Sequence, residues 1–166
     1  MELWQTLDIV APNDARRLLS ACCGSTRWVE RMLGRRPFNG RRELLSAARE
    51  EWFALTPDDW REAFTHHPKI GDRESLRRRF PTTHHLSARE QAGVETAAED
   101  VLDALAEGNR AYEERFGYIF IVYATGKTAE AMLELLRERL RNDPSREIRI
   151  AAEEQAKITE RRLTAG

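Results

Sequence analysis

The feature that most constrains the fold is a helical spacing of apolar residues that restarts after short breaks along nearly the whole chain. The clearest restart is the capping-box sequence SARE at 87–90, which is followed by an apolar stripe over residues 94–116. The next residue, Gly117, is of a type that commonly follows the end of a helix. We therefore predict one long helix from about residue 88 to residue 115.

Similar signals recur at shorter intervals. The sequence TPDD at 56–59 supplies a capping hydroxyl, a proline at the first helical position and two acids in the first turn. That helix must stop near His67, because Pro68 disfavours helical geometry in the residue before it. Short loops join the expected helices, so we predict an all-α, single-domain bundle of about seven to eight helices over residues 1–166. The remaining expected helices start at Pro12, at Ser25 or Thr26, at Asn39 or Gly40, at Thr128 and after NDP at 142–144.

Residues 118–124, with the sequence YIFIVYA, differ from the rest of the chain because β-branched and aromatic residues dominate them. This run is either a buried extended segment or a short buried helix, since periodicity does not separate the two for so short a run. Both alternatives place the segment in the core, between the long helix and the helix that begins at Thr128.

Charge and hydropathy exclude several classes of protein. The 166 residues carry 27 basic and 28 acidic side chains, a balance that argues against the basic surface of a nucleic-acid-binding domain. No apolar run approaches the roughly 18–20 residues that a membrane span needs. The first residues lack the pattern of a secretory signal, and Thr-Ala-Gly at the C-terminus is not a peroxisomal address. We therefore expect a soluble, cytoplasmic protein without nucleic-acid or membrane partners.

The cysteines and histidines occur as adjacent pairs. Cys22 and Cys23 could form only a strained vicinal bridge, so we expect a buried pair of free thiols. The histidine pairs at 66–67 and 84–85 do not suit a metal ion, because adjacent helical residues point about 100° apart. No HExxH motif or carboxylate cluster completes a site. We therefore predict that the protein binds no metal.

Two polar clusters have both a structural and a functional explanation. His67, restricted by Pro68, either ends a helix in solvent or transfers protons, since an imidazole titrates near pH ~6.5. Ser87 and Glu90 either cap the long helix or, together with Gln91, bind an anionic or carbonyl-rich ligand at its first turn.

The last helix carries an arginine on its apolar side. At 100° per residue, the apolar stripe of this helix passes through Ile148, Gln155 and Ile158. Arg162 continues this stripe, whereas Arg161 points to the opposite face. Arg162 therefore either extends past the edge of the core into solvent or pairs, as an inward cation, with an anion of the protein or of a ligand.

With these segments assembled, the sequence resembles the 2-oxo-4-hydroxy-4-carboxy-5-ureidoimidazoline (OHCU) decarboxylases of uric acid breakdown. The combination of HPKIG with SxxEQ twenty residues later is the most specific part of the resemblance. The matching segments follow the family's order over almost the whole chain: RPF at 36–38, HPKIGD at 67–72, SAREQAGV at 87–94, RFGYIFIVYATGKT at 115–128 and KITERRL at 157–163.

The resemblance implies an all-helical homodimer without metal or organic cofactor that converts OHCU to (S)-allantoin with loss of CO2. It implies that His67, Glu90 and Arg162 are catalytic, although the doubled Arg161-Arg162 leaves the position of the arginine open by one residue. It further implies that the substrate is bound by Pro68, by Ser87, Ala88, Arg89 and Gln91, and by the backbone of Ile121, Val122, Tyr123, Ala124 and Thr125.

Three alternatives stay open from the sequence. A non-catalytic helical binding module would explain the caps and the charge balance, but not five matching segments in order. A metal-dependent helical hydrolase would use the two histidine pairs. A decarboxylase of a related ureide or carboxylated ring would use the same residues, with a pocket of different shape.

Overall fold

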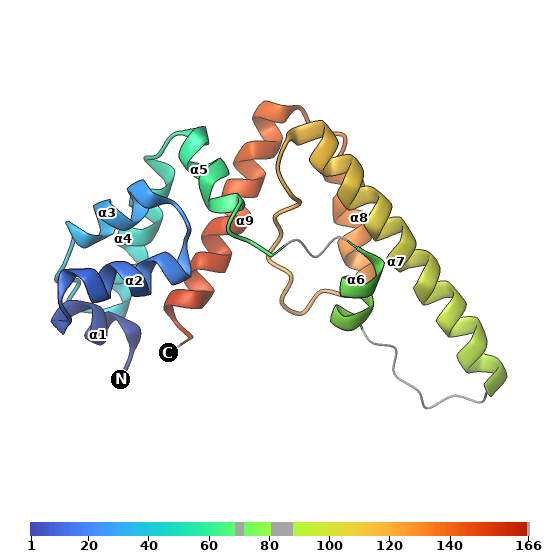
Figure 1. The fold of residues 1–166 in the computed structure, drawn as a ribbon, viewed down its shortest axis with the longest axis horizontal. Coiled ribbons are helices and arrows are strands. Elements are labelled where there is room, and N and C mark those ends of the chain that lie inside the picture. The colour runs from blue at the N-terminus through green and yellow to red at the C-terminus, as the bar shows by residue number, and fades with distance from the viewer. Residues whose placement is uncertain (69–71, 81–87, 166) are drawn as a thin grey trace. The chain divides into compact units, whose positions relative to one another are not determined.

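The computed structural model describes residues 1–68, 72–80 and 88–165, with the backbone alone for Arg73 and for residues 88–97. Within these ranges the chain forms α-helices and no strand, which confirms the predicted all-α class (Figure 1). None of the helices in these ranges is both long enough and apolar enough to cross a bilayer. The helices are α1 (Leu3–Ile9), α2 (Pro12–Cys22), α3 (Thr26–Leu33), α4 (Arg41–Phe53), α5 (Pro57–Phe64), α6 (Arg73–Arg79), α7 (Ala88–Phe116), α8 (Ala129–Arg139) and α9 (Pro144–Leu163).

These nine helices of the described residues exceed the seven to eight expected, and the two helices that the sequence did not predict are α1 and α6. Each is only seven residues long, and α1 buries only Leu7, so their apolar patterns are too short to detect by periodicity. The other starts agree with the capping signals: Ser25, Thr56 and Thr128 each accept a hydrogen bond from the backbone of the helix that follows.

The helices belong to two compact units, which we describe separately. The first unit consists of Met1–His67, Ile121–Tyr123 and Ile148–Gly166, and the second of Pro68–Phe120 and Ala124–Glu147. The expectation of a single domain over residues 1–166 stays a prediction.

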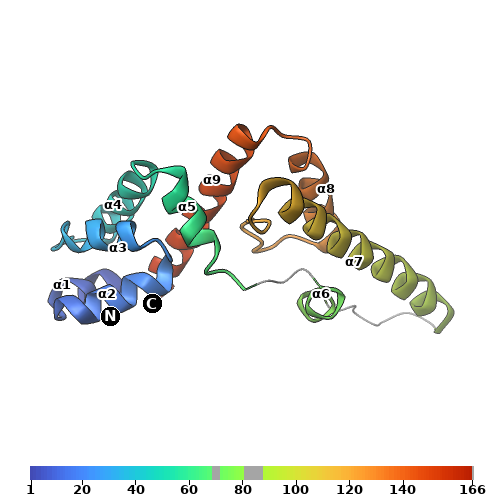
Figure 2. The ribbon, with the colours of Figure 1, turned by 45° about the horizontal axis from the view of Figure 1, so that its top comes forward.

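Helices α3, α4 and α9, drawn as ribbons in Figure 2, are joined to one another by two tryptophans of the first unit. The indole of Trp28 on α3 donates to the carbonyl of Ala48 on α4 at 3.1 Å. The indole of Trp52 on α4 donates to the carbonyl of Ala152 on α9 at 2.9 Å. Both rings are buried, and each bond satisfies the single polar atom of its ring. Helix α9 is therefore held in a fixed register against α4.

The segment that contains RPF has a structural role in the first unit. The carboxylate of Asp8 accepts hydrogen bonds from the backbone N–H groups of Phe38 and Asn39, at 2.7 and 2.8 Å. The Phe38 ring is buried, and the guanidinium of Arg36 donates to the carbonyl of Val10 at 2.6 Å. These contacts bind the loop after α3 to the region of α1.

The second unit is organised around α7, which packs against α6 and α8. Near the C-terminal end of α7, the fully buried carboxylate of Glu147 pairs with Arg139 at 2.6 Å. The same carboxylate accepts a hydrogen bond from the hydroxyl of Tyr112 on α7. The amide of Asn142 adds a further hydrogen bond to Glu147 at 3.1 Å. These partners satisfy a buried charge that would otherwise destabilise the fold.

Residues 118–124 form neither a helix nor a strand, so the short-helix alternative is wrong and the segment follows an irregular path. Helix α7 ends at Phe116, and Gly117 adopts a φ of +84°, which redirects the chain out of the helix. Tyr118 and Ile121 are buried, as expected for an apolar run of this kind.

Candidate active site

His67 lies just after α5, in the first unit. The backbone N–H groups of His66 and His67 still bond to the carbonyls of Ala63 and Phe64, at 3.1 and 3.4 Å, so a tightened turn continues the helix. Pro68 has no N–H with which to prolong it. The predicted stop at His67 is therefore confirmed, and the His67 side chain is half-buried whereas His66 and Pro68 are exposed.

The imidazole of His67 is held by the last helix. Its Nε2 is hydrogen-bonded to Oε1 of Gln155 on α9, and Nε2 of Gln155 donates to the Thr159 hydroxyl at 2.9 Å. Burial lowers the pKa of His67 below its usual value of 6.5. The hydrogen bond to Gln155 opposes this shift, whereas the charge of Arg162 lowers the pKa further. His67 is therefore neutral at neutral pH and has a free lone pair with which to accept a proton.

Arg162 also belongs to α9. Its Nη1 donates to the backbone carbonyl of Cys22 at 3.3 Å. Its positive charge contributes to the lowered pKa of His67. The remaining guanidinium N–H groups leave Arg162 capable of binding an anionic or carbonyl oxygen. Arg161 is exposed. The structure thus brings Arg162 and His67 into one electrostatic environment, while the catalytic role of Arg162 stays a prediction.

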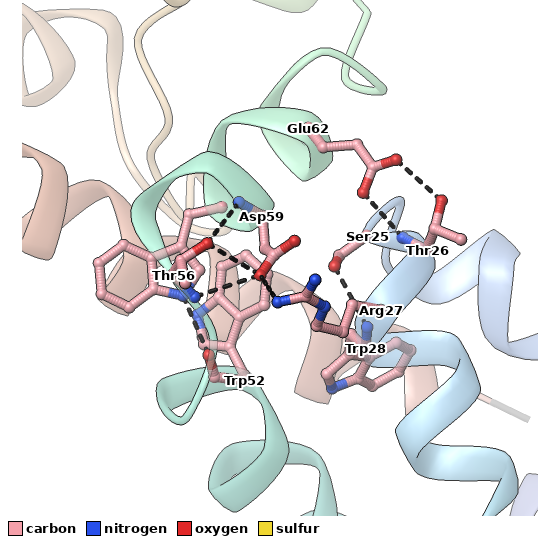
Figure 3. Close-up of polar contacts among 9 residues, drawn as sticks. Ser25, Thr26, Arg27, Trp28, Trp52, Thr56, Asp59 and Glu62 are labelled. Atoms are coloured by element: carbon pink, nitrogen blue, oxygen red, sulfur yellow. Dashed lines mark hydrogen bonds and ion pairs between the residues drawn. The ribbon is translucent and has the colours of Figure 1, made fainter.

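Helix α5, which His67 follows in the chain, is bonded to the start of α3 (Figure 3). The carboxylate of Glu62 on α5 accepts from the backbone N–H and the hydroxyl of Thr26, at 2.9 and 2.8 Å. Gly24 lies against the ring of His66, so closely that no Cβ would fit there. The last turn of α5, which carries His67, is therefore fixed to the start of α3.

The two cysteines are buried free thiols, as predicted. Burial raises the pKa of both Cys22 and Cys23 to about 11, so both are protonated at neutral pH and are poor nucleophiles. In the part of the chain that the structure describes, no three His, Cys, Asp or Glu side chains form a group that could hold a metal ion.

The residues predicted to contact a substrate through the backbone are divided between the units. Ile121–Tyr123 belong to the same unit as His67, and Ile121 is buried. The N–H of Tyr123 donates to the carboxylate of Glu154 on α9 at 3.0 Å. Pro68, Ala124 and Thr125 belong to the second unit, where Ala124 is half-buried and the other two are exposed. Val122 is half-buried in the first unit.

The predicted ligand-binding turn is described only in part. Helix α7 begins at Ala88, as the capping sequence predicted. Ser87 lies outside the described residues, and so do the side chains of Ala88, Arg89, Glu90 and Gln91. The roles assigned to these residues therefore stay predictions. The histidine pair at 84–85 also lies outside the described residues.

Sequence reasoning did not identify Gln155 and Thr159 as site residues. Both are buried, with exposed fractions of 1% and 5%. Gln155 was visible as a polar residue on the apolar stripe of the last helix, which was the available signal. Its partner, His67, lies 88 residues away in the sequence, so helical spacing alone does not reveal the contact.

Comparison with known proteins gives one consistent family. The sequence model of the OHCU decarboxylase family matches residues 10–164. The uric acid degradation bifunctional protein TTL of Arabidopsis thaliana is 38% identical over 143 residues, which are 86% of this chain and 44% of that protein. The OHCU decarboxylase of Amia calva is 34% identical over 97 residues, which are 58% of this chain and 55% of that protein. The chain therefore spans about half the length, or less, of these curated relatives.

A solved structure agrees with the sequence comparison. The crystal structure of an OHCU decarboxylase in the presence of (S)-allantoin matches with a TM-score of 0.68 and 39% identity. The match covers 87% of this chain and 92% of that chain. The fold described here is thus the fold of that structure.

Proposed function

Because the chain belongs to the OHCU decarboxylase family, we propose that it catalyses the decarboxylation of OHCU to (S)-allantoin in uric acid breakdown. The observation that carries this proposal is the neutral imidazole of His67, held by α9 and placed in the field of the Arg162 cation. A neutral imidazole in the field of a cation suits a reaction in which an anionic substrate loses CO2 and a proton is then moved.

The substrate supplies its own electron sink. Its carboxylate is attached to a carbon that bears a hydroxyl, beside a ring C=N bond. When the C–CO2 bond breaks, its electron pair forms a C=C bond and the C=N pair takes a proton at nitrogen. The resulting enol then loses its hydroxyl proton and gains one proton at the neighbouring carbon, which gives the ketone of allantoin. In sum, CO2 leaves and one proton is taken up.

The residues of this chain suit the proton and charge demands of those steps. His67 accepts the enol proton and returns a proton to one face of the neighbouring carbon. Delivery to one face accounts for a product that is a single enantiomer. Arg162 binds an anionic or carbonyl oxygen of the substrate. Glu90 binds the hydroxyl or the ureido N–H groups, and Ser87 and Gln91 position the ring and the ureido tail. Ala88 and Arg89 and the backbone of Ile121, Val122, Tyr123, Ala124 and Thr125, with Pro68, complete the proposed contacts.

We also propose that the protein works without a metal or organic cofactor, as a homodimer in the cytoplasm. The substrate's own C=N bond supports the first of these points, because no external electron sink is needed. Light scattering on the purified protein tests whether it is a homodimer, and a mass of one chain would contradict the dimer.

The proposed activity is tested with freshly generated OHCU, made from urate by urate oxidase and hydroxyisourate hydrolase. Circular dichroism follows the appearance of (S)-allantoin. We expect a rapid signal that grows in proportion to the amount of protein. Slow decay to racemic product, at the rate seen without the protein, would favour a related ureide substrate or a binding module.

A further inference from the structure

We propose that Gln155 is a positioning residue that holds neutral His67 in the tautomer protonated at Nε2, so that the bare Nδ1 is the atom that accepts the proton. The assignment of Nδ1 to the reaction rests on the proposed function, whereas the tautomer itself does not.

The proposal begins with the order of the hydrogen bonds behind His67. Nε2 of His67 bonds to Oε1 of Gln155, and Nε2 of Gln155 bonds to the hydroxyl of Thr159 at 2.9 Å. The Thr159 hydroxyl in turn hydrogen-bonds the sulfur of Cys23. Four side chains from α9 and from the ends of α2 and α5 thus form one chain of hydrogen bonds within the first unit.

The chemistry of the end member gives this chain a direction. A thiol is a weak donor, whereas a hydroxyl is a good one, so the Thr159 O–H points at the Cys23 sulfur. The Thr159 oxygen is then left to accept, and only the NH2 end of the Gln155 amide can supply that bond. The amide oxygen of Gln155 must therefore face His67. An amide oxygen only accepts, so the proton of neutral His67 lies on Nε2.

Burial makes this arrangement rigid. Gln155, Thr159 and Cys23 are exposed by only 1%, 5% and 1%. If the buried amide turned over, its NH2 group would face the Nε2–H of His67 and its oxygen would face the Thr159 oxygen, and each mismatch leaves a buried polar atom unpaired. The backbone N–H of Ser25 also bonds the Cys23 sulfur, which fixes the far end of the chain.

The consequence concerns which nitrogen does chemistry. Nε2 is occupied by Gln155, and none of the residues that the structure describes is bonded to Nδ1. Since burial and Arg162 keep His67 neutral, Nδ1 carries the lone pair that can take a proton from the substrate. His67 therefore acts first as a base, through Nδ1, and as an acid only after it has been protonated.

The first test is the tautomer of His67 in the protein without substrate. Long-range 1H–15N correlation spectra of 15N-histidine protein distinguish a protonated from a bare ring nitrogen, and the His67→Asn variant identifies the signals of His67. Above the pKa of His67 we expect Nε2 protonated and Nδ1 bare. A bare Nε2, or an equal mixture of tautomers, would overturn the proposal.

Variants then separate positioning from mere packing. In Thr159→Val the hydroxyl is lost at nearly constant volume, and we expect a mixture of His67 tautomers. Thr159→Ser keeps the hydroxyl and should restore the wild-type spectrum. If Thr159→Val leaves the tautomer unchanged, the chain of hydrogen bonds does not set it.

The kinetic test replaces Gln155 itself. In Gln155→Met we expect kcat to fall on the order of 100-fold, the cost of a small misplacement of a catalytic group, with little change in KM. In Gln155→Glu a carboxylate faces Nε2 and favours the imidazolium, so the acid limb of the pH profile should move to higher pH. Arg149→Ala, an exposed change on the same helix, is the control and should leave both quantities unchanged. Wild-type pH profiles for both Gln155 variants would contradict the positioning role.

The two proposals can fail independently. If the tautomer is as stated but the wild-type protein does not form (S)-allantoin, the proposed reaction is wrong and the role of Gln155 stands. If (S)-allantoin forms rapidly but Nε2 is bare, the reaction stands and the role of Gln155 is wrong.

Discussion

The substitution Gly24→Ala tests how the α2–α3 connection holds the catalytic histidine. A Cβ at this position would lie 2.5 Å from Cγ and Cδ2 of His66 and 2.7 Å from its Cβ. Rotating the His66 side chain about χ1 relieves the first two contacts, but the third involves Cβ, which is attached to the backbone. The turn that carries His66 and His67 must therefore move.

The size of the effect follows from the cost of overpacking, about 1–3 kcal/mol of unfolding free energy. For a chain of this length, each kcal/mol lowers the Tm by about 2–4 °C, so we expect a loss of roughly 2–12 °C. Because His67 is displaced with His66, turnover should fall further than the stability loss explains, on the order of 100-fold. Thermal unfolding and initial rates below the Tm measure the two effects.

Gly34→Ala is the matched control for this substitution. Gly34 has a helical φ of −68°, and the nearest atoms to an added Cβ lie at 3.4 and 3.9 Å. We expect unchanged turnover and a stability gain of about 0.4–1 kcal/mol, because alanine reduces the freedom of the unfolded chain. If Gly24→Ala matched Gly34→Ala in Tm and turnover, the contact with His66 would not position the site.

Three further predictions concern charge. Arg162→Ala should lower kcat/KM by about 100-fold or more. Arg161→Ala, one residue away and likewise exposed, should stay near wild type, and equal losses would leave the assignment of the arginine unsupported. Glu147→Ala leaves the charge of Arg139 buried without its carboxylate and should lower the free energy of unfolding in urea by about 3–5 kcal/mol. Loss of the exposed Glu107–Arg110 pair should change that free energy little. The pKa of His67 is lowered in the folded protein, so the unfolded chain binds its proton more readily. The unfolding free energy should therefore fall as the pH drops from about 6.5 through the folded pKa, and His67→Asn should flatten that slope; an unchanged slope would show that His67 is not buried as described.

Local chemistry explains why much of the fold could be predicted. The starts of α3, α5 and α8 depend on a capping side chain and the residues just after it, all of which are adjacent in the sequence. Helix α1 was missed because it buries one side chain and is held largely through Asp8, whose partners lie about 30 residues away. The irregular path of residues 118–124 was left open because a short apolar run fits several conformations.

The site was predictable only where a residue departed from a local pattern. Arg162 stood out as a cation on an apolar stripe, and His67 stood out because proline follows it. Gln155 departed from the same stripe, but its significance depends on His67, which a distant part of the chain brings to it. The support that Gly24 gives to His66 is likewise a tertiary contact, without a signature in either segment.

The most direct test of the account compares wild-type protein with His67→Asn in the same circular dichroism assay, on freshly generated OHCU. Folding of both proteins is checked first by thermal unfolding. We predict rapid formation of (S)-allantoin by the wild type, and formation by His67→Asn at close to the spontaneous rate despite a similar Tm. Near-normal (S)-allantoin formation by a folded His67→Asn protein would remove His67 from the mechanism and contradict the central claim.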